Sequence, residues 1–184
     1  DGTNNPDGST GWSATSGHQI GQGWDSARLI TGGGNGTLYV VHEDGRLTFF
    51  QDLKRDGTNN PDGSTGWSAT SGHQIGQGWD SARLITSGGN GTLYVVHEDG
   101  RLTFFQDLRR DGTNNPDGST GWSATSGNQI GQGWGDVRRI VSGGDGVIYA
   151  VRDDGALLFF QDLNRDGSQG WSATSGSQIG RGWP

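Results

Sequence analysis

The sequence repeats itself every 55 residues, and this repetition limits the fold more than any other feature. Residues 1–55 return at 56–110 with two changes, at the positions of Gly32 and Lys54. A third, more diverged copy spans 111–165, and a partial copy spans 166–184. Residues 1–184 therefore form a single repeat array. Its period lies near the roughly 40–50 residues of a four-stranded propeller blade.

The composition excludes several classes of protein. The 37 glycines leave no glycine-free stretch longer than eleven residues, which argues against long helices. Only 28% of residues are hydrophobic, but eight Trp, six Phe and three Tyr at regular spacing favour a folded chain over a disordered one. No apolar run approaches the roughly 20 residues of a membrane span. A net charge of −7 disfavours nucleic acids as partners, and the absence of Cys excludes disulfides and thiol chemistry.

Each copy contains four segments with strand character, separated by glycine-rich turn signals. In the first copy they are SARLIT (26–31), TLYVV (37–41), RLTFFQDL (46–53) and WSATSGHQI (12–20). Asn-Gly and Asp-Gly pairs between them favour tight hairpins, because both positions must adopt positive φ. The consecutive apolar residues of LYVV predict a strand buried on both faces, as expected where sheets pack face to face.

The repeated strings resemble those of the tachylectin-2-like propeller repeat, and they are similar to bacterial lectin-type propellers. The most specific are IGQGW at 20–24, 75–79 and 130–134, IGRGW at 179–183, and GTLYVVHEDG. The resemblance implies blades that run from an inner strand at the axis to an outer strand at the rim. It also implies sugar sites in the grooves between blades, often for N-acetylated hexosamines or fucose. The DGTNNP insert departs from the shorter family repeat.

We predict an all-β fold, a β-propeller of four-stranded antiparallel blades with three blades plus an extra outer strand per chain. Propellers usually have four to eight blades, and closing the ring protects their edges. Three blades would leave apolar blade faces uncovered. We therefore expect self-association, most simply a homodimer that closes a six-bladed ring. The surplus outer strand would exchange between chains, lie unpaired, or reflect excision from a longer array.

Two sets of tryptophans are the main candidates for carbohydrate binding, because flat apolar rings stack on the C–H faces of sugars. One set opens the outer strand, and the other closes the IGxGW turn; packing wedges between blades are the alternative for both. Polar positions beside them are further candidates, although arginines in strands are more often salt-bridge or rim residues. The candidate residues are Trp12, Trp67, Trp122, Trp171, Trp24, Trp79, Trp134, His18, His73, Asn128, Asp25, Asp80, Arg28, Arg83 and Arg138.

We expect no cofactor and no metal, although one D-x-N-x-D-G string occurs at 162–167. Calcium loops of that type close with a bidentate Glu, whereas Ala173 stands at the twelfth position here. The other two full copies place Lys54 or Arg109 at the third position, so we interpret the string as a turn. The insert residues Asp1, Asn4, Asn5 and Asp7 leave open whether that loop binds an ion.

Catalysis has little support in the sequence. GWSAT lacks the G-x-S-x-G elbow, and near-identical repeats do not supply the asymmetric carboxylate pair of a glycosidase. We therefore expect no enzyme but a multivalent lectin, secreted by analogy with the family and by its start at Asp1 rather than Met. The alternatives are a non-catalytic repeat scaffold, such as an engineered or amplified propeller fragment without a retained ligand, and a protein-interaction propeller.

Overall fold

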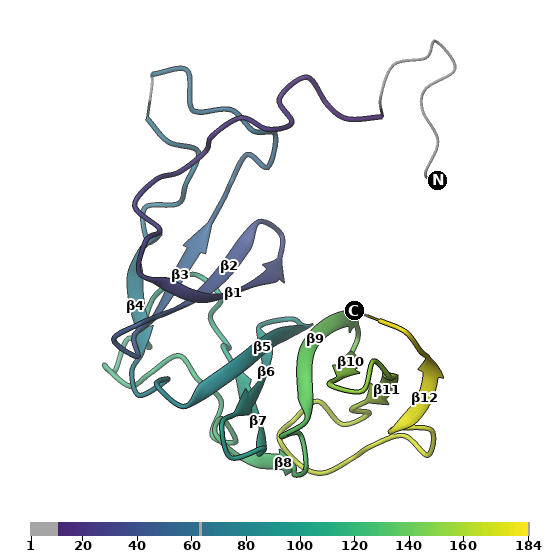
Figure 1. The fold of residues 1–184 in the computed structure, drawn as a ribbon. Helices are drawn as coiled ribbons and strands as arrows, with labels where there is room; N and C mark the ends of the chain where they lie inside the picture. Colours follow the sequence, from purple (N-terminus) through teal and green to yellow (C-terminus); the bar gives the residue numbers. More distant parts are fainter. Residues whose placement is uncertain (1–10, 63, 184) are drawn as a thin grey trace.

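The computed structural model describes residues 11–62 and 64–183, and these form three separate four-stranded antiparallel sheets (Figure 1). Within each sheet the strands lie side by side in the order of the sequence. We call the sheets blades 1, 2 and 3. Blade 1 contains β1 (Ala27–Gly34), β2 (Thr37–His42), β3 (Leu47–Gln51) and β4 (His73–Gly76). Blade 2 contains β5 (Ala82–Gly89), β6 (Thr92–His97), β7 (Leu102–Gln106) and β8 (Gln129–Gly131). Blade 3 contains β9 (Val137–Gly144), β10 (Val147–Arg152), β11 (Leu157–Gln161) and β12 (Ser177–Gly180).

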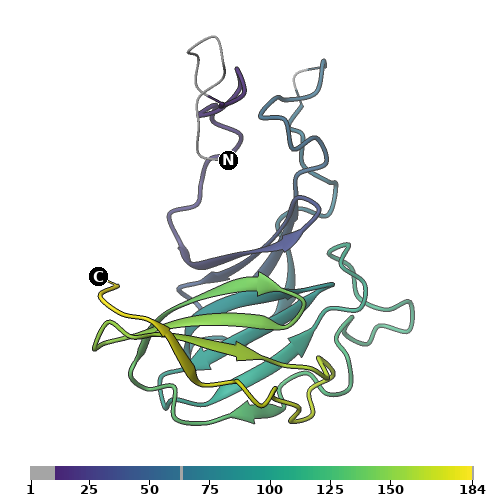
Figure 2. The ribbon, with the colours of Figure 1, turned by 90° about the vertical axis from the view of Figure 1, so that its right-hand side faces the viewer.

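The three blades stand around a common centre (Figure 1). Their first strands, β1, β5 and β9, lie innermost and contact one another in that order, while β4, β8 and β12 lie on the outside. The long connections that contain the DGTNNP insert extend away from the sheets (Figure 2). This arrangement confirms the predicted three-bladed propeller architecture with inner strands at the axis.

The strand boundaries differ from the prediction at both ends of a blade. The first strand continues through Gly32 and Gly34, with a bulge between them, and the turn falls at Asn35 and Gly36. Both turn residues have positive φ, 49° and 76°, which fits a two-residue hairpin with the right-handed twist of the strands. The predicted limits of this strand, 26–31, were therefore wrong because the glycines extend it.

The predicted outer strand, 12–20 in the first copy, is also too long. In blade 1 the corresponding strand is only His73–Gly76, and Trp67 makes an isolated bridge to Asp52. The serines and threonines between them form a turn, in which Ser71 N donates to Ser68 O at 3.0 Å. Hydroxyl side chains in such turns compete with a sheet ladder for backbone hydrogen bonds, which explains why the strand starts late.

The surplus outer segment contains no strand at all. The described residues 11–26 form turns and irregular chain. In the later copies the equivalent segments contain the short strands β4, β8 and β12. No third strand lies beside this first segment within the described part of the chain, so its backbone has no sheet to join.

The hydrophobic core lies between the blades rather than within one of them. One cluster joins Tyr39 and Phe49 of blade 1 to Leu93 of blade 2, and a second joins blade 2 to blade 3 in the same way. Residues Thr92–Val96 of the middle blade are buried at every position, which confirms the expected strand with two buried faces. Among the described residues, no helix is long and apolar enough to cross a membrane.

Candidate functional site

The same cluster of three aromatic rings recurs at each junction between consecutive repeats. It combines the IGxGW tryptophan, the second phenylalanine of the third strand, and the strand-opening tryptophan of the next copy. In the first cluster, Trp24 lies 4.5 Å from Phe50, and Phe50 lies 5.9 Å from Trp67, measured between ring centroids. We call these clusters the aromatic triads; they are Trp24/Phe50/Trp67, Trp79/Phe105/Trp122 and Trp134/Phe160/Trp171.

A hydrogen bond to the backbone fixes the third ring of every triad. Trp67 Nε1 donates to the carbonyl of Ile20 at 2.8 Å, and Trp122 and Trp171 repeat the bond at 2.7 and 2.8 Å one unit further on. A buried indole N–H requires such an acceptor. The bond orients the ring, and each of these three tryptophans remains only partly buried.

The two glycines of IGxGW serve different purposes. A Cβ at Gly76 would lie 2.8 Å from Trp79 Nε1, so only glycine allows the indole to fold back over the strand. Gly78 has a φ of +84°, which side-chain-bearing residues rarely adopt. The motif therefore places its tryptophan against the preceding strand instead of pointing it into solvent.

A groove opens beside the first triad, with a volume of about 500 Å³. A matching groove of about 380 Å³ lies beside the third triad. The first is lined by Gln19, Ile20, Gly21, Gln22, Trp24, Phe50, Asn59, Thr65, Trp67, Ser68 and Ser71. The second is lined by Ile130, Gly131, Gln132, Trp134, Phe160, Gln169, Trp171, Ser172 and Ser175. Both combine aromatic rings with amides and hydroxyls, and no charged side chain lines either of them within the described residues.

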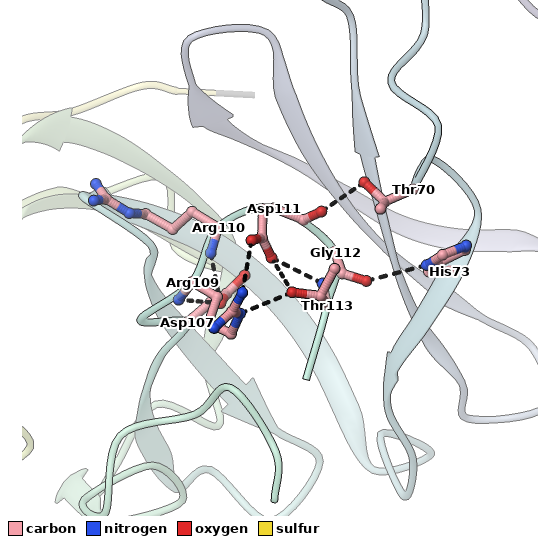
Figure 3. A network of polar contacts seen from close by, with 8 residues as sticks. All are labelled: Thr70, His73, Asp107, Arg109, Arg110, Asp111, Gly112 and Thr113. Carbon is pink, nitrogen blue, oxygen red and sulfur yellow. Dashed lines mark hydrogen bonds and ion pairs between the residues drawn. The ribbon is translucent and has the colours of Figure 1, made fainter. Parts of the chain in front are cut away.

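The predicted polar residues His73 and Asn128 lie outside these grooves and bond to the backbone at the start of the next repeat. His73 Nδ1 lies 3.3 Å from the carbonyl of Gly112, and Asn128 Nδ2 donates to Gly167 O at 3.1 Å. Figure 3 shows His73 and Thr70 reaching across to this backbone, where Thr70 Oγ1 donates to Asp111 O at 2.5 Å. His18, the equivalent residue in the first copy, is exposed.

The start of the insert in the third copy is also stabilised by hydrogen bonds among its own residues (Figure 3). Asp111 Oδ1 accepts bonds from Thr113 N and Oγ1 at 2.9 and 2.6 Å, and Arg109 Nη2 lies 3.2 Å from Asp111 Oδ2. Arg109 Nε also donates to Thr113 Oγ1 at 2.7 Å. The start of the insert is thus a structural loop locked to the neighbouring blade.

Two of the three predicted arginines connect consecutive blades. Arg28 Nη2 donates to Trp79 O at 2.8 Å, and Arg83 Nη2 donates to Trp134 O at the same distance. Arg138 donates to the carbonyl of Trp183. These contacts are to backbone oxygens rather than to carboxylates, so they differ from the salt bridges that the sequence suggested.

The remaining candidates lie apart from the triads. Trp12 is 79% exposed and lines neither of the two grooves. Asp25 and Asp80 are exposed, and the Asp80 carboxylate lies against the turn at Gly45. The structure therefore brings together six of the seven predicted tryptophans, but places the predicted polar residues elsewhere.

Sequence reasoning missed a buried pair that crosses each blade junction. Tyr39 Oη donates to Asp107 Oδ2 at 3.1 Å, and Tyr94 Oη donates to Asp162 Oδ2 at 3.0 Å. Burial and then the nearby Asp107 charge raise the pKa of Tyr39, so its hydroxyl stays a donor at neutral pH. The recurrence of Tyr and Asp with the repeat was the available signal.

The D-x-N-x-D-G string forms the expected turn. Asp162 Oδ1 accepts bonds from the backbone N–H of Asn164 and Arg165, and Asp166 Oδ1 accepts from Ser168 N and Oγ. Its carboxylates therefore already have protein donors. No group of three metal-binding side chains occurs among residues 11–62 and 64–183. The candidate ion loop of Asp1, Asn4, Asn5 and Asp7 lies outside the described residues.

Comparison with solved structures found similar folds at low sequence identity. A chain from work on the de novo evolutionary emergence of a symmetrical protein is 24% identical, with a TM-score of 0.52, over 86% of this chain and 59% of that one. A chain of the Kap60 complex with yeast RCC1 (Prp20) is 13% identical, with a TM-score of 0.41, over 85% and 37%. PorZ of Porphyromonas gingivalis is 13% identical, with a TM-score of 0.35, over 81% and 21%.

The first of these structures supports the fold assignment, and the present chain spans 59% of its length. The search of curated proteins gave no match. A family model described as Tachylectin matches residues 2–115 and 106–184, which together include nearly the whole sequence with its repeated IGxGW motifs. The chain therefore belongs to the tachylectin family.

Proposed function

We propose that this protein is a non-catalytic lectin that binds sugars in the grooves beside its aromatic triads. The carrying observation is that the same aromatic triad recurs at consecutive repeat junctions, and that uncharged polar groups line the grooves beside the first and third triads. Membership of the tachylectin family supports carbohydrate as the ligand class. The proposal keeps the six triad tryptophans of the predicted seven as the stacking residues and needs no cofactor.

The lining of the grooves favours neutral sugars. The indole ring of Trp67 can stack on the apolar face of a pyranose. Gln22 and Asn59 have exposed side-chain amides that can form hydrogen bonds with hydroxyl or N-acetyl groups of the sugar. An acidic sugar would find no cationic partner among the described lining residues. We therefore propose N-acetylated hexosamines or fucose as ligands.

Repetition of the groove supports multivalent binding. Several weak sites on one rigid body bind a dense glycan surface more tightly than any single site, because later contacts form at high effective concentration. Such binding suits glycans displayed outside cells, so we propose an extracellular location.

The burial of two triad tryptophans favours an alternative to the lectin function, namely a structural scaffold that binds no ligand. Trp79 and Trp134 are only 7% and 5% exposed, so the triads also hold neighbouring blades together. If packing were their whole role, changes to exposed groove amides would have no effect on glycan binding.

A dense glycan array tests the proposal with variants that spare the packing. We expect the wild-type protein to bind N-acetylhexosamine or fucose glycans, and the double variant Gln22→Ala, Asn59→Ala to bind less because one groove loses its exposed amides. Trp12→Ala is the matched control, since that ring is exposed and outside the grooves. No binding to any glycan, or equal binding by wild type and the groove variant, would contradict the proposal.

A further inference from the structure

One set of apolar positions is buried on blades 1 and 2 but uncovered on blade 3. Tyr94, Val96, Leu102 and Phe104 of blade 2 are fully buried beneath blade 3, and their equivalents on blade 1 are fully buried beneath blade 2. On blade 3 every equivalent position is partly or largely exposed. We call this set the rear face; it consists of Tyr149, Val151, Leu157, Phe159 and Ile179.

Blade 1 carries the opposite surface that would cover such a face. In blade 2, Ala82, Ile85 and Leu93 press on the rear of blade 1, and none is more than 8% exposed. Their equivalents on blade 1 are more open, and one of them is 51% exposed. We call this second set the front face; it consists of Ala27, Ile30 and Leu38.

The repeated tyrosine–aspartate hydrogen bond leaves one unpaired tyrosine at the rear face and one unpaired aspartate at the front face. Tyr39 and Tyr94 each donate to an aspartate of the next repeat, but Tyr149 has no such partner among the described residues. Asp52 of the first repeat is equivalent to Asp107 and Asp162, but no tyrosine hydroxyl donates to it among the described residues. One of its oxygens accepts the backbone N–H of Lys54 and Arg55, as Asp107 does with its own turn. The unmatched hydroxyl and the unmatched carboxylate belong to the rear and front surfaces respectively.

An arginine shows the same lack of a partner. Arg28 and Arg83 each reach the carbonyl of the first strand in the next blade, at Ala82 and Val137. Arg28 and Arg83 make this contact through Nη1, whereas Arg138 donates from Nη2 to the Trp183 carbonyl and its Nη1 meets no such first-strand carbonyl among the described residues. Ala27 is the residue of blade 1 that is equivalent to Ala82 and Val137. Its carbonyl in another copy of the chain would therefore be the corresponding acceptor for Arg138.

We propose that the front face of a second copy of this chain packs on the rear face, joining Tyr149 to the partner's Asp52. The junction pairs residues equivalent to those that pack at the two blade junctions inside the chain. It is a head-to-tail contact between different surfaces, and such contacts form closed rings when the rotation closes. Two copies with two such junctions make a six-bladed ring.

The junction would also rebuild the first aromatic triad, with Trp183 of one copy in the place of the other copy's Trp24. Trp183 is 49% exposed, and among the described residues no phenylalanine or tryptophan ring of a following repeat packs against it as in the triads. The partner's Phe50 and the partner's Trp67 would supply these rings. In the free chain Trp24 occupies that place, so the segment 18–24 and the strand β12 with Trp183 compete for one position. Because β12 is hydrogen-bonded to β11 and segment 18–24 joins no sheet, segment 18–24 should yield.

Sedimentation velocity over a range of protein concentrations, without sugar, tests the junction separately from ligand binding. We expect a reversible dimer. Tyr149→Phe should weaken it by roughly a hundredfold to ten-thousandfold, because each of the two junctions of the ring loses a hydrogen bond to a charged group. A wild-type protein that stays monomeric at every concentration, or a dimer indifferent to Tyr149→Phe, would overturn the proposal.

A mixing experiment tests whether the two faces differ. Ile30→Asp spoils the front face, and Val151→Asp spoils the rear face; both positions have exposed surface, and circular dichroism checks that each variant folds. Each variant alone should be monomeric. Mixed together, they should form a one-junction heterodimer from the two intact faces. Failure of the mixture to associate when both variants are folded would refute the head-to-tail geometry.

Discussion

Removing the Tyr94 hydroxyl is the sharpest test of what holds the blades together. Tyr94 Oη donates to Asp162 Oδ2 at 3.0 Å, and the two residues are 0% and 1% exposed. Tyr94→Phe keeps the ring and its packing, so no large cavity forms. The variant loses one hydrogen bond to a buried carboxylate, which typically contributes about 1.5–3 kcal/mol.

We expect the free energy of unfolding of Tyr94→Phe to fall by that amount. In a chain of this size the melting temperature should drop by roughly 3–12 °C, at about 2–4 °C per kcal/mol. Urea unfolding followed by tryptophan fluorescence, at neutral pH and fixed low protein concentration, measures the difference. Tyr39→Phe should behave alike, because its hydroxyl donates to Asp107 at 3.1 Å.

Tyr149→Phe is the matched control, since Tyr149 has no carboxylate partner among the described residues of its own chain. In dilute, monomeric protein it should change the free energy of unfolding by less than about 0.5 kcal/mol. If Tyr94→Phe and Tyr149→Phe were equally mild, the buried pair would not stabilise the blade junction and the reasoning would be refuted.

Two further predictions concern the turns and the pH response. Gly76→Ala should destabilise the fold by about 1–3 kcal/mol in thermal unfolding, because its Cβ would lie 2.8 Å from Trp79 Nε1. Gly135→Ala is the control, since a Cβ there meets open space and should leave the stability unchanged. Equal effects of the two substitutions would contradict this prediction. Burial, reinforced by Arg101, lowers the pKa of His97, so the unfolded chain binds a proton at higher pH than the folded one, and stability should fall as pH drops below about 6.5. His97→Gln should flatten this slope in unfolding measured between neutral pH and pH 5, and an unchanged slope would count against the role of His97.

The repeat made the blades predictable, because each copy carries its own turns and strand segments. The arrangement of three sheets with inner strands at the axis follows from that pattern and from the resemblance. The outer strand was harder to place. Its WSATSG portion has alternating hydroxyls that suit a strand, yet in blade 1 those hydroxyls bond locally, as between Ser68 and Ser71 at 3.0 Å.

The candidate site was predictable in its rings but not in its partners. The sequence singled out both tryptophan sets, whereas only the fold shows that Trp24 meets Trp67 of the following copy through Phe50. The contact that His73 makes was unpredictable for a related reason. Its partner, the Gly112 carbonyl, lies in the next repeat, and sequence alone does not reveal which backbone oxygen comes within reach.

A titration of indole ¹H–¹⁵N resonances with N-acetylglucosamine, N-acetylgalactosamine and fucose tests the central claim most directly. The protein has eight tryptophans, so each N–H signal is a separate probe. Binding in the grooves predicts that signals of the triad tryptophans, including Trp67, shift with sugar concentration while Trp12 stays fixed. If all eight signals stay fixed with every sugar, or only Trp12 shifts, the grooves are not the sugar sites.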